Sequence, residues 1–171
     1  MSSSGIVLPF SADALDALSA MKAGGFVNLV QLAINLEKEV IELAGASTSV
    51  IRDFTKVVTD DAPRYSFFVF KHTYEGEEQA PLIFIYTCPP ASKLKEKMMY
   101  AACRAAVIAT VENECGLRIT RKMEAASIDE IAEIQLIDEL HPKAEVKETF
   151  ARPKRPGRRG TGPSAVASDA Q

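Results

Sequence analysis

Two short runs of consecutive apolar, β-favouring residues constrain the fold of this chain more than any other feature. One spans residues 65–74 and contains Phe67-Phe68-Val69-Phe70, and the other spans residues 82–86 (LIFIY). A strand without a polar face is buried on both sides, so each run predicts a strand covered by two layers. The polar stretch Glu75-Gly76-Glu77-Glu78 between the runs predicts a hairpin tip.

A second hairpin and four helices are predicted around these strands. Alternating apolar residues predict strands over residues 26–36, 40–43 and 117–123. The first two of these strands form the second hairpin, which Gly45 closes. Capping residues followed by helical spacing predict helices over residues 11–21, 92–112 and 127–140, and another that Ser47 or Ser49 caps and that ends at about residue 58. The order α-β-β-α-β-β-α-β-α predicts an α/β fold of the α+β kind, with a mixed sheet of about five strands flanked by helices on both faces.

The predicted helix over residues 92–112 is apolar or basic around most of its circumference. Ser92 is its expected N-cap. A helical wheel places its core face on Leu94, Met98, Ala101, Ala102, Ala105, Ile108 and Ala109. Beside that face lie a stripe of Lys93, Lys97, Tyr100 and Arg104 and a stripe of Met99, Cys103 and Ala106. Either a second layer of the same protein or a partner covers such a helix. Lysines near the positive end of the helix dipole suggest an acidic partner.

Charge divides the chain into a folded part and a tail. The first 140 residues hold 13 basic and 20 acidic residues, whereas residues 141–160 hold seven basic and two acidic ones, which indicates two surfaces with different partners. We expect a domain over residues 1–142 and a disordered, Pro- and Gly-rich tail over residues 143–171. The basic residues Lys154, Arg155, Arg158 and Arg159 fit a solubilising end, an acidic protein partner or anionic lipid headgroups. Nucleic acid is a weaker fit, because the folded part is acidic.

The sequence carries no pattern for catalysis. Neither His72 nor His141 has a neighbouring nucleophile pattern, and no phosphate-binding glycine motif is present. The three cysteines have no paired spacing, which predicts reduced thiols and no metal site. No run of about 18 apolar residues predicts a membrane span, and the first residues do not form a secretory signal. We therefore expect a cytoplasmic protein that is not an enzyme and needs no cofactor.

Several segments resemble one known family. The run Lys95–Arg104 (KEKMMYAACR) resembles the long helix of the actin-depolymerising-factor homology (ADF-H) domain, as in cofilin. Residues 26–43, 63–76, 81–89 and 140–143 are similar to the C-terminal ADF-H domain of the twinfilins, and residues 148–160 resemble the start of the twinfilin tail. The resemblance implies a five-stranded mixed sheet between helices. It also implies a protein of the actin cytoskeleton that binds actin monomers and regulates filament assembly and disassembly.

The same resemblance implies a set of binding residues. Those for the actin monomer are Ser4, Gly5 and Ile6 in the N-terminal arm, Lys95, Lys97, Met98 and Arg104 on the long helix, and Ile128 and Glu130 before the last helix. The two lysines would meet acidic groups on actin, and Met98 would insert an apolar contact. Arg64 and Lys71 are candidates for a filament-side surface, and the basic tail for capping protein and phosphoinositides. The alternative is a scaffold that does not bind actin and acts through its tail on acidic lipids or capping protein.

Overall fold

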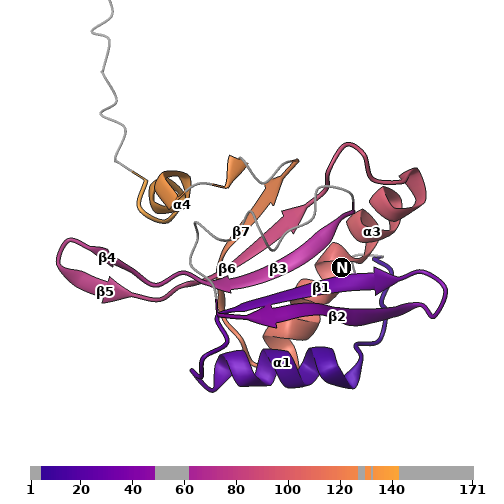
Figure 1. Ribbon diagram of the computed structural model, residues 1–171, viewed down its shortest axis with the longest axis horizontal. Coiled ribbons are helices and arrows are strands. Elements are labelled where there is room, and N and C mark those ends of the chain that lie inside the picture. The colour runs from indigo at the N-terminus through magenta and orange to yellow at the C-terminus, as the bar shows by residue number, and fades with distance from the viewer. Residues whose placement is uncertain (1–4, 49–61, 127–129, 132, 143–171) are drawn as a thin grey trace, which may run out of the picture.

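A five-stranded mixed sheet forms the centre of the protein (Figure 1). The structure, a computed structural model, describes residues 5–48, 62–126, 130–131 and 133–142. The strand order is β2-β1-β3-β6-β7, with antiparallel pairing throughout except for the parallel pair β6 and β7. The strands are β1 (Leu29–Asn35), β2 (Val40–Ser47), β3 (Arg64–Val69), β6 (Leu82–Thr87) and β7 (Ile119–Ala125). The predicted class of fold is therefore confirmed.

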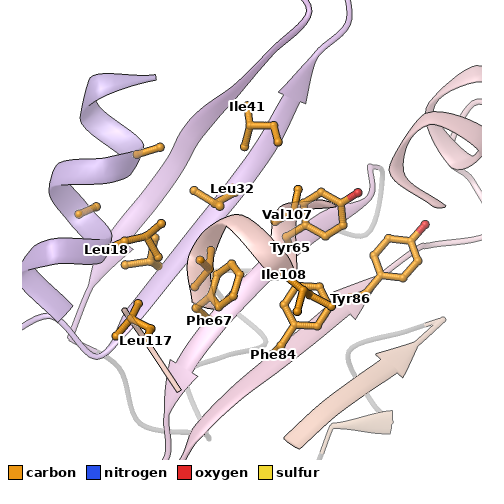
Figure 2. Close-up of a cluster of buried hydrophobic side chains, with 14 of the residues drawn as sticks. Leu18, Leu32, Ile41, Tyr65, Phe67, Phe84, Tyr86, Val107, Ile108 and Leu117 are labelled. Atoms are coloured by element: carbon orange, nitrogen blue, oxygen red, sulfur yellow. The ribbon is translucent and has the colours of Figure 1, made fainter. Parts of the chain in front are cut away.

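The two central strands, β3 and β6, are buried on both faces because their side chains alternate between two cores. Tyr65, Phe67 and Phe84 belong to the larger core, which α1 (Ala12–Lys22) and α3 (Leu94–Asn113) cover (Figure 2). Phe68, with Ile83 and Ile85, belongs to a smaller core on the opposite face, together with Leu136 of α4 (Glu133–Leu140). The unbroken apolar runs in the sequence thus reflect one layer of helices on each side of the sheet.

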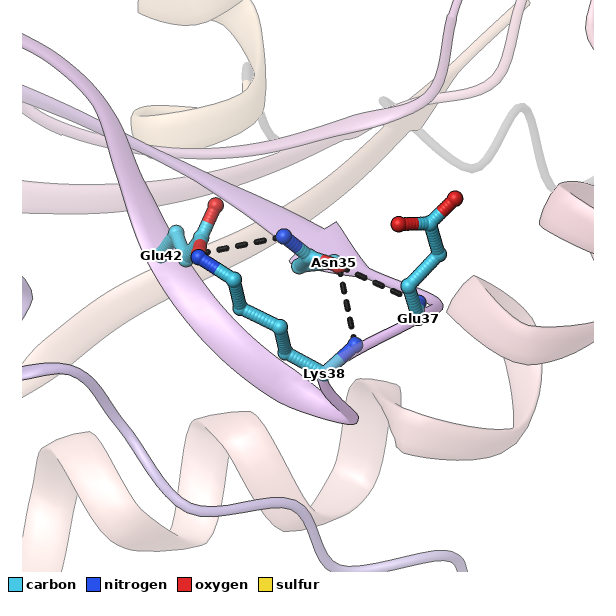
Figure 3. Close-up of polar contacts among 4 residues, drawn as sticks. All are labelled: Asn35, Glu37, Lys38 and Glu42. Atoms are coloured by element: carbon cyan, nitrogen blue, oxygen red, sulfur yellow. Dashed lines mark hydrogen bonds and ion pairs between the residues drawn. The ribbon is translucent and has the colours of Figure 1, made fainter.

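The first helix and the first hairpin have the local chemistry that their sequence predicts. Ser11 caps α1, since its hydroxyl oxygen accepts a hydrogen bond from the Ala14 backbone N–H at 3.3 Å. The turn between β1 and β2 is held by the side chain of Asn35, whose Oδ1 accepts from the backbone N–H groups of Glu37 and Lys38 (Figure 3). Asn35 Nδ2 also donates to Glu42 Oε1 at 3.1 Å, which ties the turn to β2.

The structure corrects two strand boundaries. The run 65–74 is not one strand: β3 ends at Val69, and β4 (His72–Tyr74) pairs only with β5 (Glu77–Gln79) in a separate two-stranded sheet. Pro81 has no N–H to donate, so the β3–β6 ladder cannot continue past it. Strand β2 does not close at Gly45 either, because a bulge places Gly45 opposite Gln31 and pairing continues to Ser47.

The largest correction concerns which side of α3 is buried. The inward residues are Tyr100, Cys103, Val107, Ile108 and Val111, of which the predicted core face included only Ile108. Leu94, Met98, Ala101, Ala105 and Ala109 are exposed instead, and Ala102 is half-buried. Alanine fits a core or a surface equally well, so the bulkier aromatic and β-branched residues decide the orientation. The helix also begins one residue later than expected, with Lys93 rather than Ser92 at the N-cap position.

Two predicted segments fall partly or wholly outside the described residues. The predicted helix that ends at about residue 58 is one of them, since the described chain stops at residue 48 and resumes at residue 62. Ser47, one of its two expected N-caps, is instead the last residue of β2. The other is the start of the last predicted helix at Ser127, whereas its later part is confirmed as α4.

Candidate functional site

The N-terminal arm and the first half of α3 form one continuous surface. The backbone N–H of Ile6 donates to the carbonyl oxygen of Ala102 at 3.3 Å, which fixes the arm along the helix. A β-carbon at Gly5 would come within 3.2 Å of the same oxygen, so glycine permits this close approach. The structure therefore brings Gly5 and Ile6 to the helix that carries the other predicted residues.

The exposed side of α3 is an apolar ridge, which consists of Leu94, Met98, Ala101, Ala105 and Ala109. Leu94 is 73% exposed and Met98 is 64% exposed. Of the five large hydrophobic residues that are exposed in the described chain, four lie on the arm or the ridge: Ile6, Val7, Leu94 and Met98. The fifth, Phe26, precedes β1. Exposed apolar side chains grouped in this way mark a surface that a partner covers.

Basic residues flank the ridge at the start of the helix. Lys93 and Lys95 are exposed, and they lie at the end of α3 where the helix dipole does not favour cations. Lys97 is half-buried and its Nζ donates to the Pro90 carbonyl oxygen at 2.9 Å. Lys93 and Lys95 thus extend into solvent beside the ridge, whereas Lys97 is bonded to the preceding loop.

Contacts within the domain hold the side chain of Arg104 against the sheet. Its Nη1 donates to Glu124 Oε2 of β7 at 2.8 Å, and its guanidinium lies 5.9 Å from the centroid of the Tyr86 ring. The ion pair is partly exposed, so it contributes little to stability. A partner that uses Arg104 has to share it with Glu124 or displace that carboxylate.

Strand register places Glu130 and Arg64 at the same end of the sheet as the start of α3. Arg64 pairs with Thr87, and Thr87 pairs in turn with Ala125 at the end of β7. Immediately beyond, the Ala126 backbone N–H donates to Glu130 Oε2 at 3.1 Å. The chain from Thr87 leads through Cys88 to Pro90 into α3, so this end of the sheet gathers the arm, the ridge and Glu130.

Lys71 lies at the opposite end of β3 from Arg64, beyond Val69 and next to the β4–β5 hairpin. The two candidates for a filament-side surface are therefore separated by the length of a strand, about 20 Å. Other predicted residues fall outside the described part of the chain: Ser4, Ile128, Lys154, Arg155, Arg158 and Arg159. For these residues the roles that the sequence suggests stay predictions.

A cluster of buried tyrosines lies between α3 and the sheet. Burial raises the pKa of Tyr65 and Tyr86 well above the ordinary value, and it raises the pKa of Tyr100 as well. The Tyr65 hydroxyl donates to the Tyr100 carbonyl oxygen, and the Tyr100 hydroxyl accepts from the Ile34 backbone N–H at 2.8 Å. These contacts lock the buried side of α3 to the sheet, so the ridge is presented on a rigid element.

Sequence reasoning missed part of this surface. It placed Leu94, Ala101 and Ala105 in the core and did not single out Val7. The signal that could have corrected the orientation was the spacing of Tyr100, Cys103, Val107 and Val111, the bulkier residues on one side of the helix. Among the described residues no cluster of three or more metal-ligating side chains occurs, and no helix there is long and apolar enough to cross a membrane.

Comparisons with known proteins define the class. Residues 7–141 match the family described as cofilin/tropomyosin-type actin-binding protein. The chain belongs to that family, whose members are actin-binding proteins rather than enzymes.

Solved structures share the fold at low sequence identity. Streptomyces griseoflavus cofilin has a TM-score of 0.68 and 19% identity, covering 78% of this chain and 97% of that chain. The glia maturation factor of Caenorhabditis elegans has a TM-score of 0.62 and 22% identity, covering 81% and 99%. The structure described as Eh twinfilin has a TM-score of 0.58 and 15% identity, covering 74% and 92%. At these identities the similarity concerns the fold alone.

Proposed function

We propose that this chain binds monomeric actin through the arm and the apolar ridge of α3, and that it thereby regulates filament assembly and disassembly. The observation that carries the proposal is the exposure of Leu94 and Met98 beside Lys93 and Lys95, in a member of an actin-binding family. Apolar side chains that a partner buries supply affinity, and the lysines steer an acidic partner toward them.

The ridge also has the shape that close docking needs. Beyond Met98 its residues are alanines, so a partner can approach the helix backbone along Ala101, Ala105 and Ala109. The arm lies beside the helix at Ala102 and adds the half-exposed Ile6 to the same surface. We propose that actin contacts both segments at once, with Glu130 at the rim.

Within the family, we propose that the chain is of the twinfilin type. The support is the similarity of residues 26–43, 63–76 and 140–143 to the twinfilin C-terminal domain. The basic tail residues Lys154, Arg155, Arg158 and Arg159 would then bind capping protein or phosphoinositides. Arg64 lies at the same end of the sheet as the proposed monomer contact, whereas Lys71 lies at the opposite end of β3. In this proposal, Lys71 is therefore the remaining candidate for a contact on the filament side.

A double substitution, Lys95→Ala with Met98→Ala, tests the assigned surface. Losing a methionine side chain that actin would bury and one steering cation costs about 1.4 kcal/mol or more of binding free energy, which is at least about a tenfold loss of affinity. The assay is fluorescence titration against ADP- and ATP-loaded actin monomers. The melting temperature should stay unchanged, because both side chains are exposed.

Lys22→Ala is the matched control. Lys22 is an exposed lysine whose Nζ lies 2.6 Å from the position of a β-carbon on Gly116, beyond the other end of α3. A helix of this length spans about 30 Å, so Lys22 is far from the proposed contact and its removal should leave affinity unchanged. Equal affinities for the wild type and the Lys95/Met98 variant, with intact folding, would refute the proposed surface.

Deletion of residues 152–171 separates actin binding by the domain from a scaffold that acts through its tail. Monomer binding should persist within about twofold, because the arm and the ridge are intact. No actin binding by the full chain, together with loss of all lipid and capping-protein binding on deletion, would favour the scaffold.

A further inference from the structure

The only two histidines of the chain meet in the folded protein, although they are 69 positions apart in sequence. His72 lies on β4 and His141 follows the end of α4, and their Nε2 atoms are 3.0 Å apart. Two rings enclose the pair: Phe70 stacks on His72 with centroids 4.6 Å apart, and Tyr74 stacks on His141 at 3.6 Å. The cluster lies at the end of the sheet away from the start of α3.

The neighbouring contacts determine where the protons are. His72 Nδ1 is 3.1 Å from the Phe70 carbonyl oxygen, which can only accept, so Nδ1 carries a hydrogen. In neutral His72 the lone pair is then on Nε2, and the hydrogen bond between the rings has to be donated by His141 Nε2. The ring centroids are 5.3 Å apart, which is the Nε2–Nε2 distance plus about one ring radius at each end. The two nitrogens therefore point at each other.

This arrangement accepts one additional proton but not two. A proton on His141 Nδ1 leaves its Nε2–H free to donate to His72 as before. A second proton on His72 Nε2 would place two N–H groups and two positive charges face to face, with no acceptor between them. The contact has to open when both rings are charged. The charged residues on or beside the elements that meet here are Lys71, Glu75, Glu77, Glu78, Glu133, Asp138 and Glu139, the last of which is bonded to Arg121.

The segment that the pair anchors depends on outside support. Strands β4 and β5 have three residues each and form a sheet of their own, and an isolated hairpin of this size is marginally stable. His141 ties the hairpin to the end of α4 through its hydrogen bond to His72 and its stack on Tyr74. A change at this contact therefore alters the position of the hairpin relative to α4.

We propose that His72 and His141 form a proton-sensitive clamp that holds the β4–β5 hairpin against the end of α4 and releases it when both imidazoles are protonated. The expected trigger is mild acid, in which imidazole side chains in general gain charge. The device is independent of the ridge on α3 and of the partner proposed for it.

Nitrogen NMR of the imidazole rings gives the first test, because no other histidine contributes signals. At neutral pH, in buffer containing a chelator, His72 should show a hydrogen on Nδ1 and a bare Nε2, whereas His141 should show a hydrogen on Nε2. A hydrogen on His72 Nε2 at neutral pH would overturn the proposal.

Hydrogen exchange of the hairpin amides gives the second test. In the wild type, the protection factors of β4 and β5 amides should fall about tenfold or more between pH 7.5 and about pH 5, while those of β3 and β6 hold. In His72→Gln and in His141→Gln one imidazole is replaced by an amide that can accept or donate as its partner requires, so the hairpin amides should lose this pH dependence. Equal pH dependence in the wild type and both variants would overturn the clamp.

Discussion

Tyr100→Phe should destabilise the fold mainly by leaving one buried N–H group without its acceptor. Strand β3 pairs with β1 only as far as Leu32, opposite Tyr65, and two residues later the Ile34 backbone N–H donates to the Tyr100 hydroxyl at 2.8 Å. Ile34 is 8% exposed and Tyr100 is 2% exposed, so water cannot easily replace the lost acceptor. A buried donor left without a partner costs about 1–3 kcal/mol of unfolding free energy.

For a domain of this size that loss corresponds to a fall in melting temperature of roughly 2–12 °C, at about 2–4 °C per kcal/mol. Thermal and urea unfolding followed by circular dichroism measure it. The aromatic ring stays in place, so the cost is that of the hydroxyl rather than of a cavity.

Tyr65→Phe is the matched control, because Tyr65 is an equally buried neighbour whose ring centroid lies 5.0 Å from that of Tyr100. Its hydroxyl donates to the Tyr100 carbonyl oxygen, which α3 already satisfies through its own helical hydrogen bond. Its removal should cost only about 0.5–1.5 kcal/mol. If Tyr65→Phe proves as damaging as Tyr100→Phe, the reasoning from the unsatisfied N–H is wrong.

Two further predictions concern alkaline pH and a helix end. Because burial raises the pKa of three tyrosines in the folded state, their contribution to stability is complete below about pH 10 and is lost as pH rises further. For Tyr65, Tyr86 and Tyr100 we therefore expect tyrosinate absorbance to appear only together with the loss of circular dichroism. The chain has four tyrosines, so ionisation of more than one of them in the folded protein would contradict this. Gly116 has φ of 65°, so Gly116→Ala should lower the unfolding free energy in urea by about 1–2 kcal/mol. Gly25→Ala, whose β-carbon would meet only an ordinary contact at 3.7 Å, should change it by less than about 0.5 kcal/mol.

The layers of the fold could be predicted from local sequence, because a strand that is buried on both faces consists of an unbroken run of apolar residues. Phe67 and Phe68 point into different cores, and the unbroken run that contains them predicted this correctly. The break between β3 and β4 could not be predicted from residues 65–74 alone. Its cause is Pro81 on the neighbouring strand, and which residues oppose each other is settled only when the strands pair.

The candidate site was reached by resemblance and not by periodicity. The helical wheel placed Met98 inward, whereas the family resemblance implied a contact with a partner, and in the structure Met98 is 64% exposed. Periodicity failed because α3 is rich in alanine, so a stripe of small residues was taken for a core face. The pairing of His72 with His141 left no signal in the sequence, because it depends on where the hairpin and α4 meet.

The apolar character of α3 on nearly all sides has two different physical causes. On the inward side Tyr100, Cys103 and Val107 fill space against the sheet, and the Tyr100 hydroxyl completes the hydrogen bonding of β1. On the outward side Leu94 and Met98 bury little within the chain, so they do little for folding and expose an apolar surface that favours aggregation. A fold alone gives no reason to place such residues there, next to lysines at the unfavourable end of a helix dipole. A partner that covers the ridge and is attracted by the lysines accounts for both features, and this is why the proposed actin contact rests on the exposed side of α3 rather than on the resemblance alone.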